Sequence, residues 1–250
     1  MTPRATLMLW LLAGCLLLGG QAAPAADDAP AGKKLKVAVL TGGHGFDHKT
    51  FFELFKSFPD ITYDEIVLKK DLSCFDDISQ WSYDVIVMYN MTQEITDKQK
   101  ENFLKLLDKS VGLVPMHHSL GGHANWPEYQ KIIGGRFYLT KTMVDGEPMA
   151  STYAEGVEYT IHVEDANHPV TAGVKDFKVH DEVYAKCAVE PDNKVLLTTD
   201  NAKSDKELVW VRKYRNSNVC FIMPGHGTTI FSNEDYRRLV HNAIFWTAGK

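Results

Sequence analysis

The chain has 250 residues and a formal net charge of −5. A mildly acidic chain without a block of Lys and Arg gives no support to nucleic-acid binding. This length suits one large α/β domain, and the widely spaced cysteines form neither a C-x-x-C metal motif nor a disulfide framework.

Residues 1–25 have the pattern of a signal peptide. Arg4 is followed by an apolar run at residues 7–18, and Ala23-Pro24-Ala25 has the form of a cleavage site. This run is shorter than the roughly 20 residues that span a membrane. We therefore expect a periplasmic or extracellular protein with no membrane contact in its mature form. A lipoprotein is the alternative, because Cys15 ends a lipobox-like sequence, but apolar residues continue past Cys15 and favour soluble export.

A flexible leader is predicted at residues 26–34, and a folded domain at residues 35–250. Four short apolar runs are typical of strands buried on both faces of a parallel sheet: 35–40, 61–68, 84–89 and 111–116. Helical patterns at 51–58 and 96–107 separate them, the second beginning with a capping box. This alternation predicts a doubly wound, mostly parallel sheet.

The second half of the chain is richer in strands. Several are expected as antiparallel additions to the sheet or as a flanking β layer: 159–163, 178–184, 195–199, 208–214 and 219–223. A final helix has an apolar face that starts at Tyr236 and includes Leu239 and Val240. Its predicted N-cap is Ser232, with Phe231 and Tyr236 as a hydrophobic staple.

The loops that follow the predicted strands carry most of the candidate chemistry, because open α/β sheets bind ligands beyond the carboxyl ends of their strands. The loop after the first strand holds His44 and His48 among glycines. It matches neither G-x-G-x-x-G nor a P-loop, so no nucleotide cofactor is expected. A tight turn with solvated histidines is the alternative interpretation.

The loop after the fourth strand holds His117, His118 and His123. Ser119 is not a nucleophile of the G-x-S-x-G type, because position 117 is histidine. Trp126 is either a platform on which a sugar stacks or a buried anchor of the loop.

Two further segments bring carboxylates and a glycine-flanked histidine. Asp181 and Glu182 lie in a predicted strand, where burial is costly unless they meet a cation, a metal or a shared proton. His226 follows the last predicted strand between Gly225 and Gly227. We expect His48, His117 and His226 to meet at one rim of the sheet, where they would exchange protons or bind a divalent metal such as zinc.

The order of several motifs resembles the ThuA-like proteins over residues 35–249. The matching segments are 39–48, 112–117, 126–127, 134–137, 168–173, 181–184, 225–226 and 242–246. This resemblance implies a flavodoxin-like three-layer α/β sandwich, similar in fold to class I glutamine amidotransferases. Those enzymes carry a cysteine on the elbow after a central strand, where this chain has His117, so amidotransferase activity is not implied.

The resemblance also implies carbohydrate metabolism, through trehalose utilisation and 3-keto-sugar pathways. Five residues that match the family pattern are expected to be catalytic: His48, His117, Asp181, Glu182 and His226. Three further matching residues, together with Trp126, are expected to bind substrate: His44, His118 and Tyr184. We expect an enzyme that hydrolyses, eliminates or isomerises a sugar or glycoside. The rival is a non-catalytic carbohydrate-binding or scaffold domain, and a homo-oligomer is compatible with either. Residues 140–156 depart from the family pattern, which leaves substrate specificity open.

Overall fold

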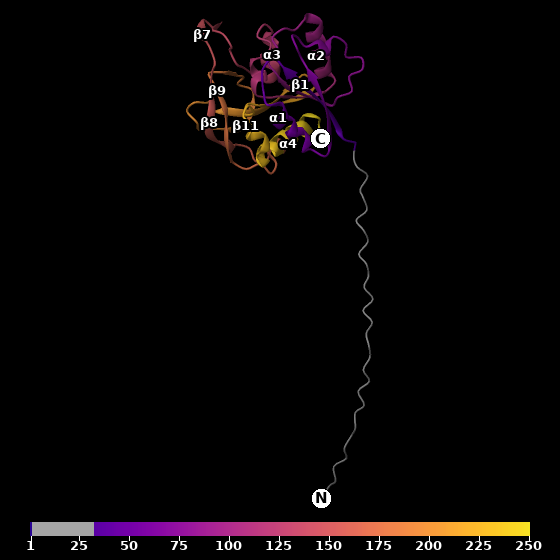
Figure 1. Ribbon diagram of the computed structural model, residues 1–250, viewed down its shortest axis with the longest axis vertical. Coiled ribbons are helices and arrows are strands. Elements are labelled where there is room, and N and C mark those ends of the chain that lie inside the picture. The colour runs from indigo at the N-terminus through magenta and orange to yellow at the C-terminus, as the bar shows by residue number, and fades with distance from the viewer. Residues whose placement is uncertain (2–32) are drawn as a thin grey trace. The chain divides into compact units, whose positions relative to one another are not determined.

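A nine-stranded sheet forms the centre of the computed structural model, which describes Met1 and residues 33–250 (Figure 1). The strand order is β2-β1-β3-β4-β13-β12-β11-β8-β9. The strands are β1 (Leu35–Gly42), β2 (Ile61–Val67), β3 (Val85–Asn90), β4 (Gly112–Pro115), β8 (Thr152–Val163), β9 (Phe177–Ala185), β11 (Lys194–Thr198), β12 (Glu207–Tyr214) and β13 (Ser217–Ile222).

The half of the sheet that contains β2, β1, β3, β4 and β13 is parallel, as the apolar runs predict. The prediction that 61–68 is buried on both faces is wrong, because β2 is an edge strand and most of its residues are exposed or half-buried. Every residue of Val85–Asn90 is buried, because layers of helices cover both faces of this central strand. Strand β13 pairs in parallel with β4 and antiparallel with β12, and it therefore joins the two halves. The predicted mostly parallel sheet is confirmed.

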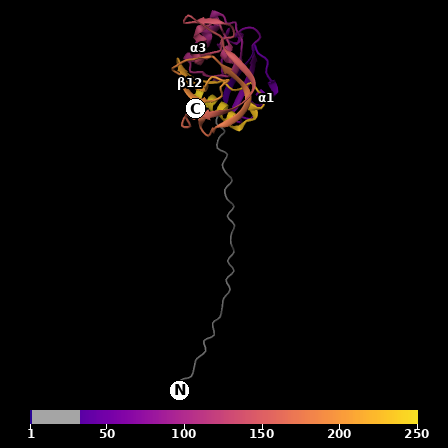
Figure 2. The ribbon, with the colours of Figure 1, turned by 90° about the vertical axis from the view of Figure 1, so that its left-hand side faces the viewer.

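The later strands extend the sheet with antiparallel pairs. The long strands β8 and β9 form its far edge, opposite β2, and their curved hairpin faces the viewer in Figure 2. Short two-stranded sheets complete the β structure, formed by β5 (Gly135–Arg136) with β10 (Ala188–Val189) and by β6 (Thr142–Val144) with β7 (Glu147–Met149). The β6–β7 hairpin lies in the stretch 140–156 that departs from the family pattern.

Four α-helices of residues 33–250 cover the sheet in two pairs (Figure 1). They are α1 (His48–Lys56), α2 (Asp97–Asp108), α3 (Pro127–Ile133) and α4 (Glu234–Thr247). Phe58, just after α1, packs against His241 of α4, whereas Phe103 of α2 packs against Trp126 at the start of α3. Helices on two faces of one sheet give the expected three-layer sandwich. Within residues 33–250, no helix has both the length and the apolar character needed to cross a membrane.

The helix starts agree with the local sequence at α2 but not at α4. Thr96 and Gln99 form the predicted capping box of α2. At α4 the predicted N-cap Ser232 is wrong, since the Asn233 side chain accepts the Tyr236 N–H at 3.0 Å. The Ser232 hydroxyl instead donates to the Thr229 carbonyl at 2.8 Å. Tyr236 is thus the third residue of the helix rather than the fourth. Phe231 and Tyr236 do pack together, with ring centroids 6.2 Å apart, but not at the positions that define a hydrophobic staple.

The predicted signal peptide, residues 1–25, lies outside the described residues apart from Met1. The same holds for the lipobox cysteine Cys15 and for most of the leader at 26–34.

Candidate active site

Loops from three strands meet at one side of a pocket of about 350 Å³. His44 lies in the loop after β1, His118 follows β4, and His226 follows β13, and all three line the pocket. The neighbouring His117 is fully buried and contacts the lining residues Glu182 and Tyr184. Because these three strands are parallel in one sheet, their carboxyl ends share one rim, as expected. The adjoining wall comes from Glu182 and Tyr184 of β9, which the antiparallel extension brings across the rim.

His117 occupies an elbow directly after β4. Its backbone has φ of 45°, the left-handed region that non-glycine residues seldom adopt, and its side chain is fully buried. The ring Nδ1 lies 2.8 Å from the Met223 carbonyl, which can only accept a hydrogen bond. The Nδ1 atom therefore carries a hydrogen, and Nε2 faces Tyr184 at 2.9 Å and Glu182 at 3.3 Å.

The groups around His117 Nε2 hold different protonation states. Burial, followed by the charge of Glu182, raises the pKa of Tyr184 well above its ordinary value, so the phenol stays protonated. Burial opposes ionisation of Glu182, but the hydrogen bond and charge of His117 outweigh it, and the pKa of the Glu182 carboxyl is lowered. A proton donor and an ionised carboxylate thus flank one imidazole nitrogen, the arrangement that general acid–base catalysis needs.

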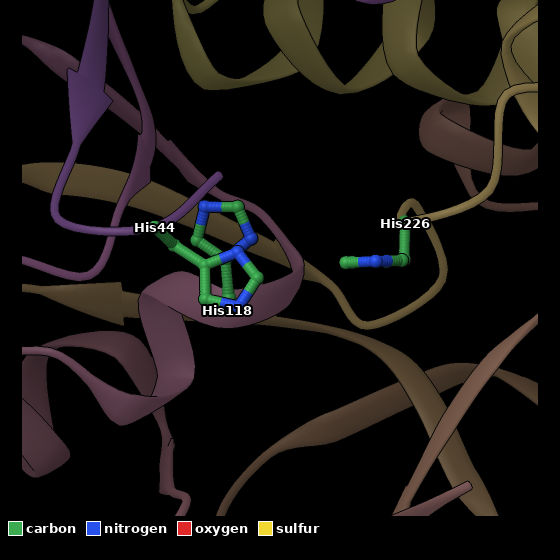
Figure 3. A group of neighbouring side chains, drawn as sticks. All are labelled: His44, His118 and His226. Atoms are coloured by element: carbon green, nitrogen blue, oxygen red, sulfur yellow. The ribbon is translucent and has the colours of Figure 1, made fainter. Parts of the chain in front are cut away.

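A second group of histidines lies beside the first. His44 stacks on His118 with ring centroids 4.7 Å apart, and His226 meets the His44 ring edge-on at 5.7 Å (Figure 3). Burial, with His117 as the next cause, lowers the pKa of both His118 and His226. Both rings are therefore neutral near neutral pH, which is the form that binds metals and accepts protons.

Asp181 holds the loop that carries His226. Its carboxylate accepts the backbone N–H groups of Gly225 at 2.6 Å, His226 at 3.0 Å and Gly227. Gly225 has φ of 142°, and a Cβ atom at Gly227 would come within 3.0 Å of the His180 carbonyl. Only glycines allow the loop to wrap this carboxylate so closely. Asp181 is therefore better described as a positioning residue than as the catalytic residue predicted from the sequence.

Residues 36–247 match the family model ThuA, described as trehalose utilisation. This chain belongs to the ThuA family. Solved structures of proteins described as ThuA-like share the fold of this ThuA-family chain. One from Parabacteroides merdae is 19% identical with a TM-score of 0.72, and the match covers 87% of this chain and 91% of the other. One from Bacteroides uniformis is 22% identical with a TM-score of 0.64, and the match covers 90% of this chain and 95% of the other.

The fold also occurs inside larger proteins. A catalytic mutant of a GH42 β-galactosidase from G. stearothermophilus is 13% identical with a TM-score of 0.53, and the match covers 83% of this chain but 30% of the galactosidase. This likeness shows the fold alone. No curated protein matches the chain.

The structure of this ThuA-family chain does not bring His48 to the histidine group. Asp47 caps α1 through the Thr50 N–H, so His48 is the first residue of a helix. Its Nε2 lies 2.7 Å from the carboxylate of Glu65 on β2, and 62% of its side chain is exposed. His48 does not line the pocket, and it is absent from both compact sets of ligand atoms. The expected set of His48, His117 and His226 is therefore corrected, with His44 and His118 taking the place of His48.

Trp126 is the buried anchor of its loop and not a sugar platform. Its side chain is 7% exposed and packs against Phe103, His123 and Tyr129. Such packing is common for tryptophan, which gains most free energy by burying its large apolar area.

The aromatic side chains that do line the pocket are Phe137, Tyr153 and Tyr184. Tyr153 is 62% exposed, and Glu155 stands beside it on β8. Sequence reasoning missed Phe137, Tyr153 and Glu155 as site residues. The available signal was that Tyr153 and Glu155 lie in the stretch 140–156, which departs from the family pattern.

His117 occupies the position after β4 where the resemblance to class I glutamine amidotransferases implies a cysteine. The described cysteines Cys74, Cys187 and Cys220 are free, and none lines the pocket. Burial raises the pKa of the Cys74 thiol to about 12, so it does not supply a thiolate near neutral pH. The pocket lining therefore offers imidazole, phenol and carboxylate groups rather than a thiolate.

Proposed function

We propose that this protein is an enzyme that acts on a sugar or glycoside by proton transfer at His117. The observation that carries the proposal is the geometry of this residue. Its backbone is held in the left-handed region at a strand end, and its Nε2 atom faces both a phenol and a carboxylate. Strained residues with a fixed tautomer are typical of catalytic sites, because the fold must stabilise a conformation that the chain alone disfavours.

The pocket wall supports a carbohydrate as the substrate class. Phe137 and Tyr153 offer aromatic faces on which the apolar face of a sugar ring packs. The carboxylates of Glu155 and Glu182 accept hydrogen bonds from sugar hydroxyl groups. Membership of a family described as trehalose utilisation agrees with this substrate class.

A carbonyl-bearing sugar, such as a 3-keto-glycoside, suits the available groups. A keto group acidifies the neighbouring C–H bond, so a base can take that proton. An acid then protonates the oxygen of the leaving group as its C–O bond breaks. His117, with Tyr184 and Glu182 beside it, provides one acid and one base. Elimination or isomerisation needs no other group, whereas hydrolysis also needs an activated water.

We further propose that the protein acts outside the cytoplasm. The support is the signal-peptide pattern of residues 1–25, with lipidation at Cys15 as the alternative form of export.

Turnover of the purified chain on a panel of 3-keto-glycosides and unmodified disaccharides tests the enzymatic proposal. We expect turnover of a carbonyl-bearing member. His117→Asn should lower kcat roughly 100-fold or more and change KM little, because general acid–base catalysis contributes about 10²–10⁴-fold. Asparagine tolerates the left-handed backbone, so this variant should fold. His162→Asn, at an exposed histidine that pairs with Asp176, is the matched control and should keep full activity.

The rival function, a non-catalytic carbohydrate-binding domain, gives a different result. It predicts sugar binding without turnover across the panel, and equal affinity in the wild type and in His117→Asn. Calorimetry on both proteins with the same panel measures this. Binding with no turnover would overturn the enzymatic proposal.

A further inference from the structure

Three histidines that line the pocket form a compact set of possible metal ligands that does not include His117. His44, His118 and His226 each offer a nitrogen, and these nitrogens lie within 4.8 Å of one another. The three residues come from the loops after β1, β4 and β13, so only the folded sheet brings them together (Figure 3).

The hydrogen bonds of His118 fix which nitrogen is free. Its Nε2 lies 3.1 Å from the Tyr89 carbonyl, so this nitrogen carries the hydrogen and donates. The lone pair then lies on Nδ1, which is buried and has no partner in the described part of the chain. The side chain is 1% exposed. A buried acceptor without a partner costs free energy, and its presence indicates a ligand.

His44 repeats this pattern in the opposite tautomer. Its Nδ1 lies 2.7 Å from the Gly45 carbonyl and therefore donates, which leaves the lone pair on Nε2. An imidazole that donates to a backbone carbonyl through one nitrogen and presents the other is the usual arrangement of metal-binding histidines.

His226 is held by its backbone. The Asp181 carboxylate accepts its N–H at 3.0 Å, and the ring Nδ1 is buried without a partner among residues 33–250. The loop thus fixes where this ring lies and leaves Nδ1 unused by the described residues.

We propose that His44, His118 and His226 bind one divalent transition-metal ion of the zinc class. Imidazole nitrogens favour zinc and its neighbours over magnesium or calcium, which prefer oxygen ligands. Three protein ligands with a fourth position open to the pocket is the arrangement of catalytic zinc sites. Such an ion would supply a Lewis acid next to His117 and Glu182. The site stands on its own geometry and does not require the proposed reaction.

A second compact set, His117, Glu182 and His226, shares one histidine with the first. In this set the Nε2 atom of His117 already meets Tyr184 at 2.9 Å and Glu182 at 3.3 Å. These partners satisfy it, whereas Nδ1 of His118 has no partner among the described residues. We therefore assign the ion to the three-histidine set, and the two sets make different predictions for mutants.

Metal analysis of the full chain tests the site. The protein is stripped with a chelator, dialysed against zinc or cobalt, and assayed for bound metal and for the visible absorption of cobalt(II). We expect about one equivalent in the wild type, as the single site implies. His44→Ala and His118→Ala should weaken affinity roughly 100-fold or more, because each removes a ligand. His44 is exposed, so its variant should fold even if His118→Ala does not, and thermal melts check both.

His48→Ala and His117→Asn are the matched controls and should retain the ion. His48 is the neighbouring exposed histidine that pairs with Glu65, and His117 belongs to the competing set. Absence of a stoichiometric ion from the wild type would refute the site. Unchanged metal affinity in His44→Ala, or loss of the ion in His117→Asn, would refute it as well. Turnover by a wild type that binds no stoichiometric ion would overturn this inference alone, and a bound ion without turnover would overturn only the proposed function.

Discussion

His117 shows how backbone and side-chain chemistry are coupled at a single residue. A φ of 45° turns the chain sharply after β4 and points the ring between β13 and β9. The Met223 carbonyl then selects the tautomer, and Tyr184 and Glu182 share the remaining nitrogen. By resemblance to class I amidotransferases this is the place of the nucleophilic cysteine, so the same elbow presents a different functional group.

His123 is a second histidine that the fold holds in an unusual state. Its side chain is 1% exposed and packs against Tyr129, with ring centroids 4.9 Å apart. Neither ring nitrogen has a hydrogen-bond partner within the described residues. Burial lowers its pKa to about 4. Because an unfolded histidine titrates near pH 6.5, the unfolded chain takes up the proton first as the pH falls. The stability linked to His123 is therefore complete above about pH 6.5 and is lost towards about pH 4.

Replacement of His123 by asparagine should flatten the acid side of the stability profile. From about pH 7 to about pH 5 the wild type should lose about 2 kcal/mol more free energy of unfolding than His123→Asn, from linkage between the two pKa values. Asparagine suits the left-handed backbone here, where φ is 48°. Urea denaturation of both proteins at the two pH values measures the difference. Equal pH dependence would show that His123 titrates normally in the folded chain.

At the scale of elements, the start of α4 decides how the last helix docks on the sheet. Asn233 accepts the Tyr236 N–H, and the Tyr236 hydroxyl donates to the Pro224 carbonyl at 2.8 Å, just before the His226 loop. The cap is therefore linked to the site through one tyrosine.

Asn233→Ala should lower the free energy of unfolding by about 1 kcal/mol, the usual loss for an N-cap. Ser232→Ala is the matched control and should cost less than about 0.5 kcal/mol, because its hydroxyl makes only an exposed hydrogen bond to Thr229. Thermal or urea denaturation compares the two. A larger loss in Ser232→Ala would restore the cap predicted from the sequence.

At the scale of the whole molecule, Asp181 ties the antiparallel extension to the parallel sheet. It lies on β9, at the far edge of the strand order, yet its carboxylate holds the loop after β13. The hairpin of β8 and β9 thus supplies both a pocket wall and the support for His226.

Asp181→Ala should lower the free energy of unfolding by about 3 kcal/mol, since it leaves one buried and two half-buried N–H groups without this acceptor. The amides of Gly225, His226 and Gly227 should also exchange hydrogen faster. Hydrogen-exchange mass spectrometry and urea denaturation measure the two effects. Asp200→Ala, at an aspartate whose side chain is 87% exposed, should change neither. Unaltered exchange at these amides in Asp181→Ala would contradict the positioning role.

Sequence patterns alone predict the parallel half of the molecule and the loops that carry histidines. Strands such as β1 and β3 are near-continuous apolar runs, and burial on both faces leaves this mark in the sequence. The capping box of α2 is also predicted from the sequence, because it depends only on two residues that lie three positions apart. Position after a strand then placed His117 and His226 at the rim, since parallel strand ends share one edge.

Tertiary structure decided which side chains meet. His44 and His48 lie in one loop, but a helix start turns His48 towards Glu65 and leaves His44 against His118. The order of the antiparallel strands, which brings Asp181, Glu182 and Tyr184 to the site, depends on pairings between segments far apart in the chain. Local patterns record burial and period but not pairing partner or side-chain direction, so these contacts exist only once the sheet has assembled.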